Sequence, residues 1–194
     1  MSTSKPSRRP YHHGDLPAAL VRAAGQILDT QGLEAVTLRE VARKAGVSHG
    51  APYRHFPSLD HLLAAVAEQG FGELGNALKG RSAAEMGEAY VRFGLEHPAR
   101  FRLMFGGLVG VARHPGLRDA SQAVYGALVE ALKTRGEIAE PEKAAAAAWA
   151  LVHGLTMLLS DGHLEGLAAT VGRDRVARAV LGAIRFAGAS QRSA

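Results

Sequence analysis

Apolar residues recur along the chain at the three- and four-residue spacing of amphipathic helices. The first series follows Asp15, which can cap a helix, and ends at Gly32, which can stop one. Its apolar face consists of Leu16, Leu20, Ala23, Ala24, Ile27 and Leu28. No run alternates apolar and polar residues between turn residues, the pattern typical of a half-buried strand. The chain is therefore predicted to be all-α.

Capping residues predict three further helices in the N-terminal part of the chain. Thr37 opens a short helix with the capping-box spacing, and Gly46 suits the left-handed turn after it. Ser48 can cap a third helix over roughly 49–55, and Ser58 can cap a fourth. The fourth helix has an apolar face of Leu59, Leu62, Leu63, Val66 and Ala67.

The C-terminal part repeats this pattern. Ser82 opens a helix with a second capping box, and Pro98 starts a short aromatic helix that the glycines at 106 and 107 stop. Three longer helices are predicted at about Leu117 to Arg135, Pro141 to Ser160, and Thr170 to Ala187.

Residues 70–75 match the G-x-G-x-x-G spacing of a dinucleotide site. Such a site needs a preceding strand, whereas a helix precedes this segment, so we reject that interpretation. Each glycine costs a helix roughly 1 kcal/mol relative to alanine. The segment therefore predicts that the fourth helix weakens here and forms a hinge between an N-terminal head and a C-terminal body.

Composition narrows the class of protein. A length of 194 residues fits one domain, or two small ones that share a core. The absence of cysteine excludes a disulfide scaffold, a cysteine nucleophile and a thiolate zinc site, and it fits the reducing cytoplasmic compartment. The N-terminus lacks the apolar stretch of a signal peptide. A net charge of +5 and a pI near 9.9 hint at a polyanionic partner.

One uncharged run, 144–160, resembles a membrane span in composition. A span needs about 20 apolar residues, whereas this run is shorter and Ala-rich and contains three polar side chains. It is predicted to be a helix buried on more than one side, with no membrane partner. One side carries Trp149, His153 and Met157, and the other carries Val152, Leu155 and Leu159. The two sides together favour a helix that is buried against both its own core and a partner subunit.

The segment Thr37 to His55 carries the strongest functional pattern. A capped helix, a tight turn and a second short helix form a helix-turn-helix, whose second helix can enter the DNA major groove. Arg39, Arg43, Lys44 and Arg54 outnumber the single acidic residue of this segment. Because such cations neutralise phosphates, we favour DNA binding over a purely structural helical hairpin.

At these motifs the chain resembles a known family. HGDL, TLREVARKAGVS and APYRHFPSLDHLL, which lie within residues 13–63, look like the N-terminal DNA-binding domain of TetR/AcrR-type bacterial transcriptional regulators. The later WALVHGL, from Trp149 to Leu155, is similar to the second-to-last helix of a subgroup named for its Trp-His-Gly signature.

The resemblance implies an all-α homodimeric regulator without enzymatic activity or cofactor. A three-helix head binds double-stranded operator DNA, and a linker helix joins it to a helical domain that binds a small, largely apolar effector. The last two long helices form the dimer interface. The implied division is a flexible basic arm at 1–13, a helix-turn-helix domain at 14–60, and a ligand-binding and dimerisation domain at 61–194.

Expected DNA contacts carry over by position or follow from charge. They are Thr37, Arg39, Arg43, Lys44, Ser48, His49, Gly50, Tyr53 and His55. Arg8, Arg9, His12 and His13 are either a minor-groove arm or a solvated tail. Two residues depart from the family. Leu59 replaces a phosphate-binding lysine, whose role passes to His61 or to the arm. Pro52 lies inside the recognition helix, which is therefore expected to start as a distorted turn.

Side chains of the C-terminal half predict an apolar ligand pocket, with ordinary core packing as the alternative for each residue. The candidates are Phe93, Phe101, Met104, Phe105, Tyr125, Trp149, His153 and Met157. The nine histidines show no metal-ligand spacing, and His153 is either a hydrogen-bonded core residue or a ligand contact. Two rival functions stay open: an architectural DNA-binding protein without a cavity, and a small helical enzyme or carrier.

Overall fold

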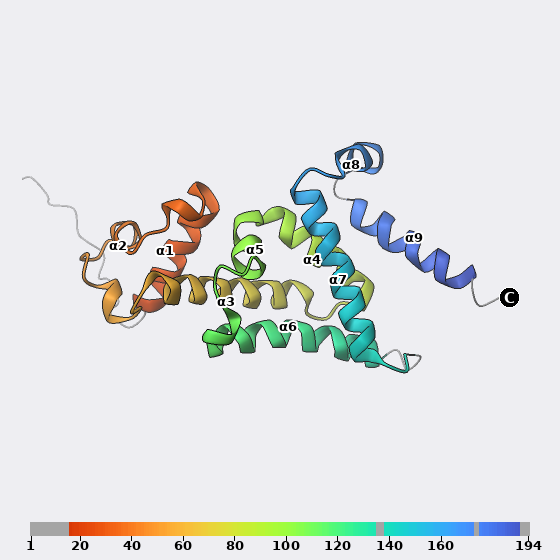
Figure 1. The fold of residues 1–194 in the computed structure, drawn as a ribbon, viewed down its shortest axis with the longest axis horizontal. Coiled ribbons are helices and arrows are strands. Elements are labelled where there is room, and N and C mark those ends of the chain that lie inside the picture. The colour runs from red at the N-terminus through yellow and green to blue at the C-terminus, as the bar shows by residue number, and fades with distance from the viewer. Residues whose placement is uncertain (1–15, 135–137, 173–174, 191–194) are drawn as a thin grey trace, which may run out of the picture.

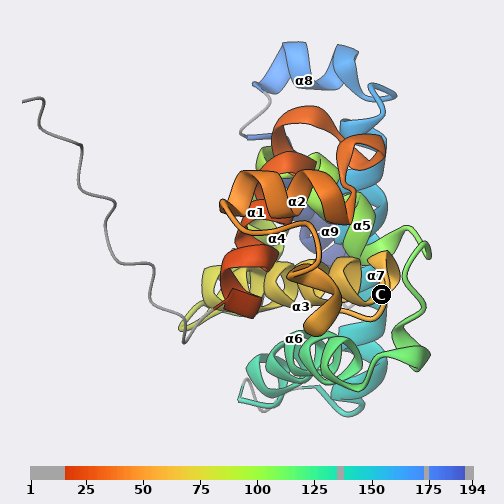
Figure 2. The same ribbon diagram turned by 90° about the vertical axis from the view of Figure 1, so that its left-hand side faces the viewer.

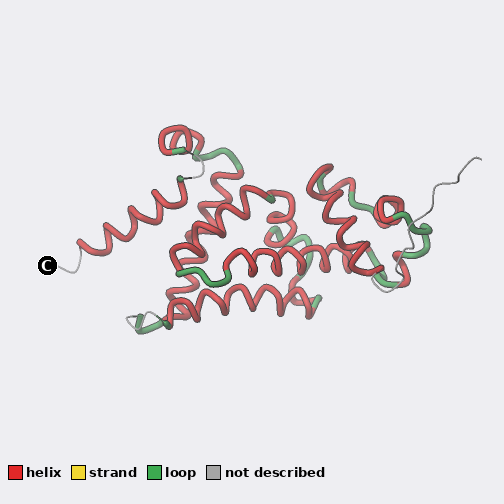
Figure 3. The backbone as a smooth tube through the Cα atoms, turned by 180° about the vertical axis from the view of Figure 1, so that it is seen from behind, coloured by secondary structure: helices red, strands yellow, loops and turns green. Residues whose placement is uncertain are grey.

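The computed structural model describes residues 16–134, 138–172 and 175–190, and its side chains as far as Ala183. Within these ranges it contains helices and loops and no strand, which confirms the all-α prediction (Figure 3). The helices are α1 (Leu16–Gln31), α2 (Leu38–Ala45), α3 (Leu59–Leu78), α4 (Ala83–Glu96), α5 (Pro98–Phe105), α6 (Pro115–Lys133), α7 (Pro141–Ser160), α8 (Glu165–Val171) and α9 (Val176–Ser190). Three short 3₁₀ turns are η2 (Leu33–Ala35), η3 (Pro52–Arg54) and η4 (Val111–Arg113).

The head consists of α1, α2 and the loop that follows them, at one end of an elongated molecule (Figures 1 and 2). Helix α1 ends where Gly32 takes a φ of 83°, a left-handed conformation that favours glycine. Leu20, Ala24 and Leu28 of α1 are fully buried or nearly so. They pack with Val41 of α2 in the core that continues into the body.

Helix α3 joins the head to the body and runs unbroken through 70–75 (Figure 1). The predicted weakening and hinge at these glycines are therefore wrong. A Cβ at Gly70 would lie 2.7 Å from the Sδ of Met104 in α5, a distance too short for real atoms. Gly70 thus allows the close approach of α5, and burial of Phe71 and Leu74 beside it offsets the helix cost of glycine.

The body surrounds the C-terminal half of α3. Helix α4 starts with the complete capping box predicted at Ser82 and Glu85, and α5 starts at Pro98 as expected. Helix α6 lies along α3 on one side, while α4 and α5 cover the other (Figure 1). Helix α7 crosses this layer and packs against both α4 and α6.

Helix α7 spans Pro141–Ser160, the bounds predicted from sequence. It is long and apolar enough to cross a membrane by composition. One of its sides, including Val152, Leu155 and Leu159, is buried against the rest of the body, whereas most of the helix stays at least partly exposed, so burial on more than one side is not seen in the single chain. Ala147 and Leu158 on another side are exposed in the single chain.

The last predicted helix, Thr170 to Ala187, is wrong in one respect. Helix α8 ends at Val171 and α9 begins only at Val176. Gly172 takes a φ of 86°, which a continuous right-handed helix does not allow. Helix α9 packs on α4, where Arg178 donates to Glu88 at 2.8 Å from its Nη2 and at 3.1 and 3.2 Å from its Nε.

A charged cluster ties the head to the body. Arg100 of α5 is only 8% exposed and forms ion pairs with Asp29 of α1, at 2.5 Å, and with Glu73 of α3. A Cβ at Gly25 would lie 3.0 Å from Arg100 Nη2, so the small residue leaves room for the guanidinium. One side chain therefore joins three helices across the boundary between head and body.

Replacing Arg100 with methionine should lower the free energy of unfolding by about 2 kcal/mol. The change leaves two carboxylates facing each other without a cation, although both are partly solvated, which keeps the loss below that of a fully buried pair. Arg102→Met on the same helix removes an exposed ion pair to Asp161 and should cost less than about 1 kcal/mol. Equal losses in urea denaturation would contradict the interpretation.

Candidate functional site

The first helix and the turn of the predicted helix-turn-helix form at the predicted positions. The Thr37 hydroxyl accepts a hydrogen bond from the Glu40 amide at 3.1 Å, and Gly46 takes the left-handed conformation after α2. The reciprocal half of this capping box is absent, because the Glu40 carboxylate pairs with Arg43 Nε at 2.8 Å. Ala42 is fully buried and Val47 packs on the core, so the turn is held by apolar contacts.

The predicted recognition helix over 49–55 is wrong as a regular helix. Residues 48–51 form a turn, and only η3, Pro52–Arg54, is helical. Pro52 has no amide to donate to the Ser48 carbonyl, which instead accepts from Ala51 at 3.0 Å. This bond joins residues three apart, as in a 3₁₀ helix, rather than four apart as in an α-helix, so the backbone is wound more tightly here. The predicted cap at Ser48 is therefore absent, whereas the distorted start expected from Pro52 is present.

All nine residues predicted to contact DNA are exposed on the head. They are Thr37, Arg39, Arg43, Lys44, Ser48, His49, Gly50, Tyr53 and His55. The Tyr53 side chain is 62% exposed, so nothing in the single chain explains it as a core residue. Leu38, Pro52 and Phe56 are buried beneath them and hold this surface in place. The four arm residues, Arg8, Arg9, His12 and His13, and the expected cap Asp15, lie outside the described residues.

The start of α3 lacks the side-chain cap predicted at Ser58. Ser58 occupies the cap position, but its hydroxyl hydrogen-bonds His61 Nδ1 at 2.9 Å rather than a helix amide. Leu59 packs against the core, while His61 is exposed. Asp60 is held by His114 Nε2 at 2.8 Å, which fastens the start of α6 to the start of α3.

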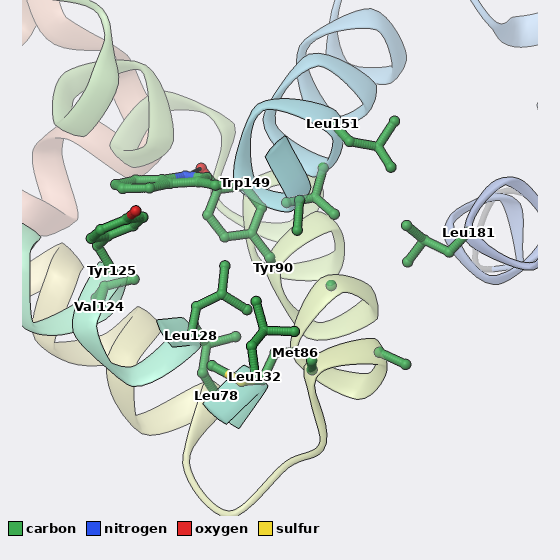
Figure 4. Close-up of a pocket in the computed structure, with 15 residues that line it drawn as sticks. Leu78, Met86, Tyr90, Val124, Tyr125, Leu128, Leu132, Trp149, Leu151 and Leu181 are labelled. Atoms are coloured by element: carbon green, nitrogen blue, oxygen red, sulfur yellow. Dashed lines mark hydrogen bonds between the residues drawn. The ribbon is translucent and has the colours of Figure 1, made fainter. Parts of the chain in front are cut away.

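A cavity of about 230 Å³ lies in the body between α3, α4, α6 and α7, and Leu181 of α9 also lines it (Figure 4). Its lining contains no charged side chain. The lining residues are Leu78, Ala83, Ala84, Met86, Gly87, Tyr90, Val124, Tyr125, Leu128, Leu132, Ala148, Trp149, Leu151, Val152 and Leu181. Figure 4 shows the stacked rings of Trp149 and Tyr125 at one side, and Leu151 and Leu181 at the other.

A second, shallower hollow adjoins the cavity. It is lined by Phe105, Tyr125, Ala146, Trp149, Ala150 and His153, and it shares the stacked Tyr125 and Trp149 with the cavity. We call these two spaces the inner cavity and the outer hollow. The two spaces share the stacked rings of Tyr125 and Trp149, whose centroids are 5.5 Å apart.

Four of the eight side chains predicted to contact a ligand line one or both of these spaces, and their role in binding stays a prediction. Tyr125 and Trp149 line both spaces, and Phe105 and His153 line the outer hollow. Three others are buried in the core: Phe93, Phe101 and Met104. The ring of Phe93 also packs on the ring of His97. Met157 is half-buried against the same core. Periodicity identified these side chains as inward-facing but did not show which of them border a void, and it missed Tyr90, Met86 and the leucines.

A hydrogen-bonded chain of three side chains stands beside the inner cavity. Trp149 Nε1 donates to the Tyr90 hydroxyl at 2.9 Å, and this hydroxyl is 3.0 Å from His153 Nδ1. Burial raises the pKa of the Tyr90 phenol and lowers the pKa of the His153 imidazole, so both are held neutral. Phe101 stacks on the His153 ring at a centroid distance of 5.4 Å.

No group of three or more histidine and acidic side chains that could hold a metal ion occurs in the described part of the chain. The described histidines are also scattered over several elements: His61 and His114 lie at the start of α3 and α6, and His153 lies in α7. The geometry is that of a helical protein with an exposed cationic surface at the helix-turn-helix segment and a partly open apolar cavity in the body.

Comparison with known proteins agrees with this class. Residues 83–184 match the family profile described as a tetracyclin repressor-like C-terminal domain, and residues 20–66 match that of the bacterial regulatory proteins of the tetR family. Because the first match alone covers more than half of the chain, the chain belongs to the TetR family. The finer resemblance to the Trp-His-Gly subgroup stays a prediction, as does the exact boundary between the two domains.

Individual relatives differ in how much of the chain they cover. A protein of unknown function from Rhodococcus sp. RHA1 has a similar solved structure, with a TM-score of 0.75, 31% identity, and coverage of 89% of this chain and 95% of that one. The regulator BetI of Rhizobium meliloti is 43% identical over 29% of this chain and 28% of its own. A transcriptional repressor of Mycobacterium tuberculosis is 31% identical over 31% and 32%. The chain spans about a third of the length of these curated relatives.

The lowered pKa of His153 predicts a pH-dependent stability. An unfolded histidine titrates near about pH 6.5. Because the folded imidazole resists protonation, the contribution of His153 to the free energy of unfolding is fully present above that pH. This contribution falls as the pH drops from there towards the lower pKa of the folded state. The loss should reach at most about 1.4 kcal/mol per pH unit. His153→Asn should remove this component in urea denaturation between pH 7.5 and 5, whereas parallel profiles would contradict it.

Proposed function

We propose that the chain is a sequence-specific DNA-binding repressor that acts as a homodimer in the bacterial cytoplasm and leaves its operator when a small molecule binds. The observation that carries this proposal is the exposed, cationic helix-turn-helix surface. Its cations and its tyrosine are exposed in the single chain, and packing within the chain does not account for them, although Arg43 also pairs with Glu40.

The head supplies two kinds of DNA contact in this proposal. Arg39, Arg43 and Lys44 of α2 neutralise phosphates, which supplies sequence-independent affinity and fixes the position of the head. The turn at 48–51 presents His49 and Gly50 to base edges. A Cβ at Gly50 would meet nothing within 4 Å, so packing within the chain does not require a glycine here. In this proposal the small residue allows the DNA to come close to the backbone.

The proposed dimer forms through α7 and α9. On α7, Ala147, Gly154 and Leu158 recur at helical spacing on one face, and Leu158 is 45% exposed. A Cβ at Gly154 would meet nothing within 4 Å in the single chain, so this face is open to a partner helix. Two-fold symmetry then presents two heads to an operator with two half-sites.

The inner cavity supports release by a small, largely apolar ligand. Because its lining contains no charged side chain, a charged ligand would lose hydration there without meeting an opposite charge. An architectural DNA-binding protein has no need of such a space, and an enzyme would need polar groups that converge on it. Release requires that the ligand prefer a dimer geometry that fits DNA poorly, by a free energy that matches the affinity lost.

The decisive experiment selects binding sites from random duplexes with the purified protein. Tyr53→Ala should then weaken binding to the selected operator at least tenfold, about 1.4 kcal/mol, without changing the thermal stability. Arg39→Ala should also lower the slope of log affinity against log salt by about 1. Lys79→Ala, at the far end of α3, serves as the control. Unchanged operator binding by the Tyr53 variant in gel-shift assays would overturn the DNA interface.

A charge on the open face of α7 tests the dimer. Leu158→Glu should convert the dimer to a monomer in sedimentation velocity at micromolar concentration, because two buried carboxylates would face each other across the two-fold axis. Leu108→Glu is the matched control, since Leu108 is 51% exposed but lies in the loop after α5. A dimer in both variants would place the interface elsewhere.

A further inference from the structure

The polar atoms around the inner cavity already have partners. The Tyr125 hydroxyl donates to the Glu142 carbonyl at 2.7 Å, and the Tyr90 hydroxyl lies between Trp149 Nε1 and His153 Nδ1. Every other lining side chain is aliphatic, a thioether or glycine. The inner cavity therefore offers a ligand apolar contact and no unpaired donor.

Hydrogen-bond chemistry fixes the proton positions in the Tyr90 chain. An indole N–H can only donate, so the Tyr90 oxygen accepts from Trp149 and its single proton goes to His153 Nδ1. A neutral imidazole carries one proton, and Nδ1 is here the acceptor. His153 therefore carries its proton on Nε2.

His153 Nε2–H has no hydrogen-bond partner among the residues that the structure describes. His153 lines the outer hollow together with the rings of Phe105, Tyr125 and Trp149. Its ring is fixed from both sides: Phe101 stacks on it, and Phe105 meets it edge-on at 5.0 Å. A half-buried donor that is held in one orientation within an aromatic hollow is suited to recognise an acceptor on a ligand.

We propose that the inner cavity and the outer hollow are two parts of one ligand site, and that its ligand is an uncharged, apolar molecule carrying a carbonyl or ether oxygen that accepts a hydrogen bond from His153 Nε2–H. This assignment deepens the ligand-release function proposed above and rests on it. The apolar body occupies the inner cavity against Tyr125 and Trp149, which line both spaces, and the oxygen points into the adjoining outer hollow towards His153.

The arrangement also discriminates against other ligands. A carboxylate or an amine would lose its hydration without meeting an opposite charge, since neither space has a charged lining residue. A plain hydrocarbon fits the inner cavity but leaves the His153 donor without a partner. The site therefore favours a ketone, a lactone or an ether over both the hydrocarbon and the acid of the same shape.

Trp149 is the only tryptophan of the chain and lines both spaces, so its fluorescence reports ligand binding without DNA. The probes are α-tetralone, tetralin and tetralin-1-carboxylate, which share one bicyclic body and differ in the oxygen and the charge. The wild-type protein should bind tetralone about three- to tenfold more tightly than tetralin, the range expected for one added hydrogen bond. It should bind the carboxylate most weakly.

Two substitutions at His153 separate its two nitrogens. His153→Asn keeps an acceptor near Nδ1 for Tyr90 but has no donor near Nε2, so the preference for tetralone over tetralin should vanish. His153→Gln places an amide N–H near Nε2 and should restore part of that preference. Leu103→Ala, a buried change on α5 that borders neither space, is the control for general loosening of the body and should leave all affinities as they are.

Three results would overturn the proposal: no fluorescence response to tetralone or tetralin at millimolar concentration, equal affinity for these two probes in the wild type, or tightest binding of the carboxylate. A parallel gel-shift assay with the selected operator keeps the two proposals distinct. Operator binding with no probe binding would reject the ligand site and leave the DNA-binding function in place. Probe binding as described with no operator binding would do the reverse.

Discussion

The burial of α3 along most of its length is the constraint on which the rest of the structure depends. Leu62 and Val66 belong to the core beneath the head, whereas Leu74 and Leu78 belong to the body. Both groups sit on one unbroken helix, so head and body cannot be positioned independently. Gly70 allows α5 to pack against this helix, and Arg100 then closes the contact with carboxylates from two elements.

Local signals in the sequence were sufficient for most of the fold. Helix caps at Thr37 and Ser82 and prolines at helix starts act over only a few residues, so the helix starts can be predicted directly from the sequence. The failures are of another kind. Glycines in α3 look like a weak point until the packing of Met104 is known, and the break at Gly172 depends on one left-handed residue within an otherwise helical pattern.

The site shows the same division between local and long-range information. The exposed surface of the head could be predicted because it lies in one continuous segment. The Tyr90–Trp149–His153 chain could not, because its hydrogen bonds join residues 59 and 63 positions apart. Periodicity indicates which residues face inward, but the location of an internal space depends on how α4, α6 and α7 fail to fill the volume between them.

The continuity of α3 has a mechanical consequence. A helix of 20 residues is about 30 Å long, and an unbroken one behaves as a stiff rod over that distance. A tilt of only about 5° at its body end would therefore displace the Ser58 end by roughly 2–3 Å, by simple leverage over that length. Such a shift is comparable to the length of a hydrogen bond. Small rearrangements around the inner cavity are therefore enough to move the distant exposed surface of the head out of register with whatever it binds.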